Sequence, residues 1–225
     1  RGETLRVMPG YIDLMTPNAV ADQVQGVHLI GMYQALLPTL IEFSLFAFTQ
    51  AHVFPEIGDA KAELSPQPAG GRAPGLMLLE RTLGGATVQL DADQHRVPRD
   101  EIRHAVAVYT ALLMARYVWL HELAHCAKGH VSFIKGTGIA LRLYEVEDGA
   151  ASLVTPRTNP KINEQARLNI LRLMEYDADE TAFMGLCRIQ LQDGENIEGI
   201  KALDLPLRLG LSVFAAYVAT WLFEE

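Results

Sequence analysis

Residues 121–125 read His-Glu-Leu-Ala-His, a pattern whose residue types and spacing suit metal chemistry. Side chains four residues apart lie on one face of an α-helix, so the imidazoles of His121 and His125 can reach the same zinc ion. Glu122 lies about 100° further round the helix, where its carboxylate can reach a water molecule on the metal. Two histidine ligands and a glutamate base are the parts that zinc-dependent hydrolysis needs. We therefore expect Zn²⁺ as the cofactor and Glu122 as the catalytic base.

The helix that carries this motif has clear start and stop signals. Pro98 suits the first turn of a helix, and Asp100 and Glu101 suit the positive end of its dipole. Gly129 follows the motif and is a typical helix stop. The residues between these signals are apolar on almost every side, which predicts a central, buried helix. Buried histidines and a buried glutamate need polar partners, and a metal ion would supply one.

A catalytic zinc site takes three protein ligands, so a third ligand is needed. His130 lies nine residues after His121 and would point the opposite way on a continuous helix, so we expect it to lie at a helix end or to support a ligand. Three acids on a later helix offer better candidates. Asp177 points about 200° away from Glu175, and Asp179 shares the face of Glu175 but has a shorter side chain. We expect Glu175 as the third ligand, with Asp179 and then His130 as alternatives.

At Glu175-Tyr176-Asp177-Ala178-Asp179, together with the histidine motif, the chain resembles the gluzincin zinc metallopeptidases. The Glu-x-x-Ala-Asp form is similar to that of the HtpX-like and CAAX-prenyl-protease-like families, and the histidine motif is equally similar to that of the Lit-like phage-exclusion peptidases. The resemblance implies a zincin-like catalytic core in which Glu175 binds zinc and Asp179 supports a ligand histidine from behind. It covers about residues 117–131 and 171–184 and implies no substrate class.

Two long apolar segments have to be distinguished from membrane spans. Residues 26–54 are interrupted by Pro38 and by polar residues such as Glu42, which the interior of a bilayer disfavours. We expect a helix or a helix pair here, broken near Pro38 and packed into the core. From Pro206 onward the chain is again apolar, but its continuous apolar run, Leu209–Phe223, is about five residues short of a comfortable span, and a core helix is again expected. Membrane contact is the less favoured alternative.

Loops and strands complete a predicted α+β fold that is mostly helical. Residues 76–90 predict a β-hairpin with its turn at Gly84-Gly85, and the free edge of such a hairpin could hold an extended substrate. A further helix should begin at Asn159-Pro160 and end near Leu191. We expect one metallopeptidase-like domain over residues 1–225. Its expected parts are an N-terminal helical part, 1–55, and a catalytic core, 76–225.

The composition indicates which partners and which cellular compartment to expect. The chain has 225 residues and a net charge of −8, without a lysine and arginine cluster that would suit phosphate groups, so we expect no nucleic-acid partner. Two cysteines, Cys126 and Cys187, form no disulfide framework and fit a reducing compartment. No apolar signal-peptide segment follows Arg1. We expect a cytoplasmic protein, with membrane association as the alternative.

Together these patterns predict a zinc metalloendopeptidase that acts on peptide or protein substrates. Zinc would polarise the scissile carbonyl, and Glu122 would take a proton from the water and pass it to the leaving amine. The alternative is a helical interaction protein or membrane-associated protein whose zinc site is structural or inactive. A side chain that stabilises the oxyanion is also needed. The unranked candidates are Tyr176, Arg157, Arg172 and Tyr217.

Overall fold

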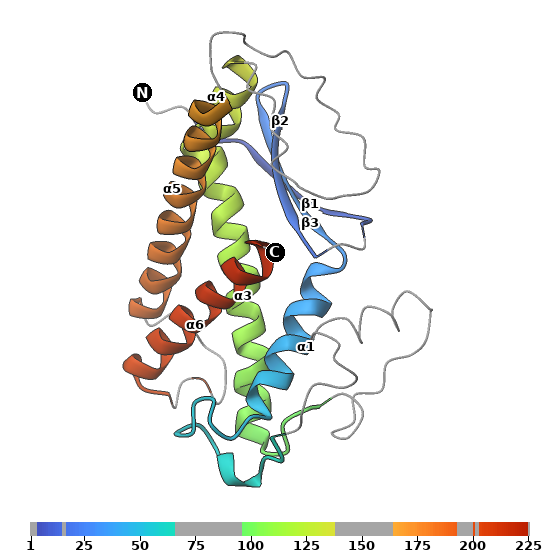
Figure 1. Cartoon of the computed structure of the whole chain (residues 1–225), viewed down its shortest axis with the longest axis vertical. Coiled ribbons are helices and arrows are strands. Elements are labelled where there is room, and N and C mark those ends of the chain that lie inside the picture. The colour runs from blue at the N-terminus through green and yellow to red at the C-terminus, as the bar shows by residue number, and fades with distance from the viewer. Residues whose placement is uncertain are drawn as a thin grey trace.

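A long helix, α3, runs through the length of the molecule (Figure 1). The computed structural model describes residues 4–14, 17–65, 96–137, 164–192, 200 and 203–224. Helices α5 and α6 pack against α3 on one side, and α1 packs against it on another. The coarse prediction of a mostly helical α+β fold is confirmed. The described helices are α1 (Leu36–Phe48), α3 (Glu101–Ala127), α4 (His130–Thr137), α5 (Glu164–Leu191) and α6 (Leu205–Glu224).

A three-stranded sheet lies beside one half of α3 (Figure 1). Its order is β1-β3-β2, with β1 parallel and β2 antiparallel to β3. Gln25 and Gly26, with φ of 50° and 78°, form the two-residue turn between β2 and β3, a backbone conformation that suits a tight hairpin. Because β2 is an edge strand, it can pack directly against α3 and α4. The strands are β1 (Val7–Ile12), β2 (Ala19–Val24) and β3 (Val27–Tyr33).

The prediction for residues 26–54 is wrong in its first part. Residues 27–33 form strand β3 and not a helix, so the expected helical part, 1–55, contains three strands as well as α1. A seven-residue apolar run has no period that separates a buried strand from a helix, and the hairpin turn before it decides the outcome. Pro38 does not break α1, because it is the third residue of that helix, where no intrahelical partner for a backbone N–H is lost.

The predicted stop of α3 near Gly129 is confirmed, whereas its start is slightly later than expected: Pro98 precedes the helix, which begins at Glu101. The Asp100 side chain caps the helix by accepting a hydrogen bond of 2.9 Å from the Arg103 backbone N–H. The helix ends at Ala127, and Gly129 follows with a φ of 79°, which a residue without a side chain adopts freely. The helix is central but not buried all round, since Leu112 is exposed.

Helices α5 and α6 match the expectations in part. Helix α5 ends at Leu191 as predicted, whereas the expected start at Asn159-Pro160 and the expected hairpin at 76–90 lie outside the described residues. Helix α6 is longer than the sequence suggested. Among the described helices it alone, over Leu205–Leu222, is long and apolar enough to cross a membrane, and 33% of that stretch is buried inside the structure. Its buried side packs on α3 and α5 as a core helix does.

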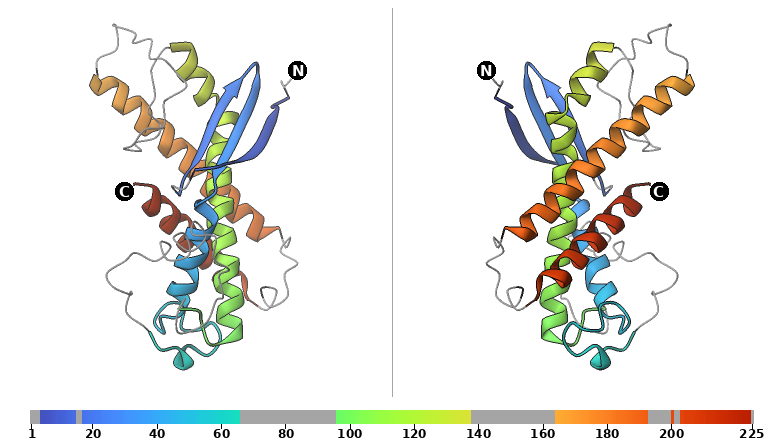
Figure 2. Two further views of the ribbon diagram at one scale, coloured as in Figure 1. Left: turned by 90° about the vertical axis from the view of Figure 1, so that its right-hand side faces the viewer. Right: turned by 90° about the vertical axis from the view of Figure 1, so that its left-hand side faces the viewer.

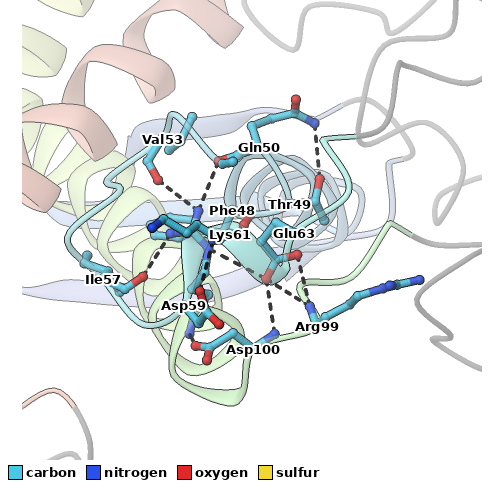
Figure 3. A network of polar contacts seen from close by, with 12 residues as sticks. Phe48, Thr49, Gln50, Val53, Ile57, Asp59, Lys61, Glu63, Arg99 and Asp100 are labelled. Atoms are coloured by element: carbon cyan, nitrogen blue, oxygen red, sulfur yellow. Dashed lines mark hydrogen bonds and ion pairs between the residues drawn. The ribbon is translucent and has the colours of Figure 1, made fainter.

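A buried arginine ties the first turn of α3 to the loop that follows α1 (Figure 3). All five N–H donors of Arg103 reach backbone carbonyl groups at 2.9–3.1 Å. The Glu63 carboxylate lies 3.7 Å from Arg103 Nε and also accepts hydrogen bonds from the backbone N–H groups of Arg99 and Asp100. The loop therefore folds around one cation. The carbonyl groups belong to Phe48, Gln50, Val53, Phe54 and Ile57.

Replacing this arginine should destabilise the whole fold. Arg103→Met leaves five carbonyl groups without donors and Glu63 without its cation, and breaking a buried pair in this way costs about 3–5 kcal/mol. Arg103→Lys keeps the charge and has three donors, so it should lower the free energy of unfolding by less than Arg103→Met does. Urea unfolding measures both, with the exposed Arg188→Met as the control. Equal unfolding midpoints for Arg103→Met and the control would contradict the role of this network.

Candidate metal centre

Two side chains of α3 and one of α5 bring their donor atoms together. His125 Nε2 lies 2.9 Å from His121 Nε2, and Glu175 Oε2 lies 3.2 Å and 3.5 Å from these two nitrogens. Atoms about 2.0–2.1 Å from a tetrahedral zinc ion are about 3.3–3.4 Å from one another, so the observed spacing fits a metal ion. The three donors expected from the sequence therefore form a cluster that could hold a metal ion.

Small residues on α5 allow Glu175 to reach α3. Figure 2 shows α5 crossing α3 obliquely. Ala178 and Ala182 are fully buried on α5, and a Cβ atom added at Gly185 would lie 3.2 Å from the Leu120 side chain of α3. Side chains of this size let two helices approach closely, so one glutamate can span the gap between them.

The cluster is open to solvent on the α5 side. The side chain of Glu175 is 41% exposed, whereas those of His121 and His125 are 18% and 4% exposed. The two imidazoles are thus held inside the protein, and the carboxylate forms the accessible edge of the cluster.

Asp179 supports His121 from behind. Its Oδ1 atom lies 2.8 Å from His121 Nδ1 and accepts a hydrogen bond of 2.8 Å from the Tyr117 hydroxyl. Thr220 of α6 lies 3.0 Å from that hydroxyl. A hydrogen on His121 Nδ1 leaves Nε2 free to face the other donors, which is the arrangement a metal ligand requires. Tyr117 precedes His121 by one helical turn and so was within reach of sequence reasoning, but Thr220 comes from a distant helix.

His130 lies behind the second ligand histidine. The two Nδ1 atoms of His130 and His125 are 3.1 Å apart, and His130 Nε2 lies 3.1 Å from Asp177 Oδ2. The assumption of a continuous helix is wrong here, because α3 ends before Gly129 and α4 begins at His130. The expected supporting position of His130 is therefore reached by a change of helix direction. Asp177 lies outside the donor cluster but contacts it through His130.

Glu122 is buried between α3 and the sheet. Its carboxylate accepts a hydrogen bond from the backbone N–H of Ala21, on edge strand β2. Burial raises the pKa of Glu122, and nearby His121, His125 and the Ala21 amide oppose that rise. A carboxylate with a raised pKa is a stronger base, which suits proton transfer. Sequence reasoning gave no indication of Ala21, because only the folded sheet places it beside the motif.

The donor groups carry complementary charges. Burial by itself lowers the pKa of His121, but the carboxylates of Asp179 and Glu175 outweigh it and raise this pKa to about 10. Burial by itself raises the pKa of Glu175, and His121 and His125 outweigh it and bring this pKa to about 2. At neutral pH the metal-free cluster therefore holds a protonated His121 facing an ionised Glu175. A bound metal ion would replace that proton as the positive charge.

The candidates for oxyanion stabilisation differ in position. Tyr176 and Tyr217 are 69% and 71% exposed, Arg172 is exposed, and Arg157 lies outside the described residues. Tyr33, at the end of β3, is buried, and its pKa is raised by burial and by the charge of Glu122. Sequence reasoning did not single out Tyr33, since nothing in its local pattern places it near residue 122.

Removing the third donor should remove tight zinc binding. Glu175→Ala takes away one of three ligands and the accessible carboxylate, so its zinc affinity should fall by more than the roughly 10–100-fold typical of an outer residue. Competition with a chelator measures the affinity. Glu180→Ala, an exposed acid on the same helix, is the control. Stoichiometric zinc at native affinity in Glu175→Ala would show that the ligand assignment is wrong.

The contact between Asp179 and His121 gives a separate prediction. Asp179→Asn should leave the fold intact and weaken zinc binding by about 10–100-fold, because the ligand imidazole loses its charged partner. Tyr117→Phe removes one donor to Asp179 and should have a smaller effect. The same chelator competition ranks the three proteins. Wild-type zinc affinity in Asp179→Asn would contradict this role and would mean that Asp179 only connects α5 to α3.

Known proteins offer no further guidance on this centre. No family model, curated protein or solved structure matches the chain. The function of the chain therefore has to be inferred from its donor atoms, their spacing and the groups that hold them.

Proposed function

We propose that this protein is a zinc-dependent metallopeptidase of the gluzincin type. The observation that carries the proposal is the convergence of His121, His125 and Glu175 next to a buried glutamate, Glu122. Two nitrogens and one carboxylate oxygen are a common ligand set of catalytic zinc, whereas structural zinc sites usually have four ligands and often cysteine. Within the described residues the cluster has three donors and no cysteine, which supports a catalytic site.

Each residue of the centre then has a role in hydrolysis. His121, His125 and Glu175 would hold a zinc ion, which would supply a Lewis acid for the scissile carbonyl and for a water molecule. Glu122 accepts the proton of the attacking water and passes it to the leaving amine. The amide of Ala21 holds the Glu122 carboxylate in place, and Asp179 keeps the Nε2 atom of His121 directed at the cluster.

Strand β2 lies along the side of the metal centre where an extended peptide substrate would pair. In the described part of the chain, β2 pairs with another strand on its β3 side alone. Its Ala21 amide bonds to Glu122, and its Gln23 carbonyl accepts a hydrogen bond from Lys135 of α4, so its second edge faces the helices of the metal centre. Edge strands are where extended peptides pair with a protein. A peptide that paired along this edge would displace the contacts of Ala21 and Gln23, and the hairpin that the sequence suggested for substrate binding, 76–90, lies outside the described residues.

A second candidate function rests on α6. This helix has the length and composition of a membrane span, and Val213, Tyr217 and Trp221 recur along one exposed side of it. A helical interaction or membrane-associated protein with a structural or inactive zinc site would use that side. Stable association with lipid vesicles without hydrolysis would favour this alternative. Hydrolysis that requires zinc would favour the peptidase.

The general base gives the direct test of the proposed function. Glu122→Gln keeps the shape of the side chain and removes the proton acceptor, so the variant should fold and bind zinc as the wild type does. Its rate should fall by about 10²–10⁴-fold. The assay uses a library of quenched fluorescent peptides with the zinc-loaded protein, and Glu180→Gln serves as the control. Equal rates for wild type and Glu122→Gln would overturn the proposed mechanism.

A further inference from the structure

We infer that His130 and Asp177 are positioning residues that hold His125 in its metal-binding orientation. This inference rests on the proposed zinc centre. The three side chains form a chain of polar contacts in which each step is 3.1 Å, from His125 Nδ1 to His130 Nδ1 and from His130 Nε2 to Asp177 Oδ2. Lys128 continues it, since its Nζ atom lies 3.1 Å from Asp177 Oδ1. None of these outer residues is a member of the donor cluster.

One placement of hydrogens satisfies the whole chain. A neutral imidazole that offers Nε2 to a metal carries its hydrogen on Nδ1. His125 Nδ1–H therefore donates to His130 Nδ1, which must be the unprotonated acceptor. The hydrogen of His130 is then on Nε2 and is donated to Asp177. The carboxylate of Asp177 thus fixes the tautomer of His130, and His130 in turn fixes the tautomer of His125.

The different burial of His130 and Asp177 indicates how Asp177 acts on the centre. His130 is buried, so both of its ring nitrogens need partners, and the described partners are His125 and Asp177. Asp177 and Lys128 are 39% and 45% exposed, and an ion pair in solvent contributes little to stability by itself. The effect of Asp177 should therefore be transmitted through His130.

The two ligand histidines are held in different ways. His121 contacts the Asp179 carboxylate directly, whereas a neutral imidazole separates His125 from Asp177. Gly129 makes the second arrangement geometrically accessible, because its φ of 79° turns the chain so that α4 begins with His130 facing back toward α3. The carboxylate that supports His125 thus lies one imidazole further from the donor atoms.

Zinc affinity, measured by chelator competition, tests this assignment without relying on hydrolysis. His130→Phe fills the volume but offers no acceptor to His125, so affinity should fall by about 10–100-fold. His130→Asn can place an oxygen near the Nδ1 position and should recover most of that loss. The zinc affinity of Asp177→Ala should fall by less than that of His130→Phe. Glu180→Ala is the matched control on α5, and His52→Ala removes an exposed histidine elsewhere.

The double variant separates positioning from a purely structural role. If Asp177 acts through His130, then Asp177→Ala should cause no further loss of affinity when it is added to His130→Phe. Independent, additive losses would overturn the inference. So would wild-type affinity in both single variants while wild-type protein binds zinc tightly.

The remaining outcomes are also decisive. Failure of the wild type to bind zinc would overturn the proposed function and this inference with it, which distinguishes that result from an effect confined to the variants. If circular dichroism shows that His130→Phe does not fold, then the zinc affinities of Asp177→Ala and His130→Asn test the inference instead. A loss of zinc affinity in Asp177→Ala with unchanged unfolding of the metal-free protein supports the positioning role, and unchanged affinity overturns it.

Discussion

The polar groups buried along α3 are the constraint on which the rest of the structure depends. A buried charge or imidazole costs several kcal/mol unless it finds partners, so neighbouring segments have to supply them. Near the start of α3, the loop after α1 folds its carbonyl groups around Arg103. Near its end, β2 supplies an amide to Glu122, and α5 supplies carboxylates to His121. One helix therefore organises both the stability of the fold and its candidate metal centre.

The packing of α5 on α3 brings the donors into contact. Buried alanines allow the two helices to approach closely, so that Glu175 and Asp179 face α3 and Asp177 faces the start of α4. Glu175 reaches the donor cluster, Asp179 reaches His121, and Asp177 reaches His130. A short acidic segment thus provides one candidate ligand and two supporting groups: Glu175 and Asp179 lie one turn apart on the same helix face and both contact His121, whereas Asp177 points elsewhere and contacts His130.

Groups behind the two imidazoles engage the ring nitrogens that do not face the cluster. The imidazoles of the two candidate ligands, His121 and His125, each have one nitrogen engaged in this way, which leaves a single nitrogen of each directed at the cluster. Thr220 extends this support to α6 through Tyr117, so α3, α4, α5 and α6 all contribute side chains around the centre. Outer residues of this kind set the orientation and affinity of metal ligands, and the proposed activity would depend on them as much as on the ligands themselves.

The sequence alone was sufficient to predict those elements whose signals lie within a few neighbouring residues. The spacing of His121 and His125, the acids at positions 100 and 101 and the stop at Gly129 predict a helix with two imidazoles on one face, because each rule acts within one or two turns. Strand β3 escaped prediction, since its apolar run has no distinguishing period and its pairing with β1 and β2 is a tertiary property. The partners Ala21, Asp177 and Thr220 were likewise decided by tertiary structure alone. They lie far from the motif in sequence, and only the packing of other elements against α3 brings them to it.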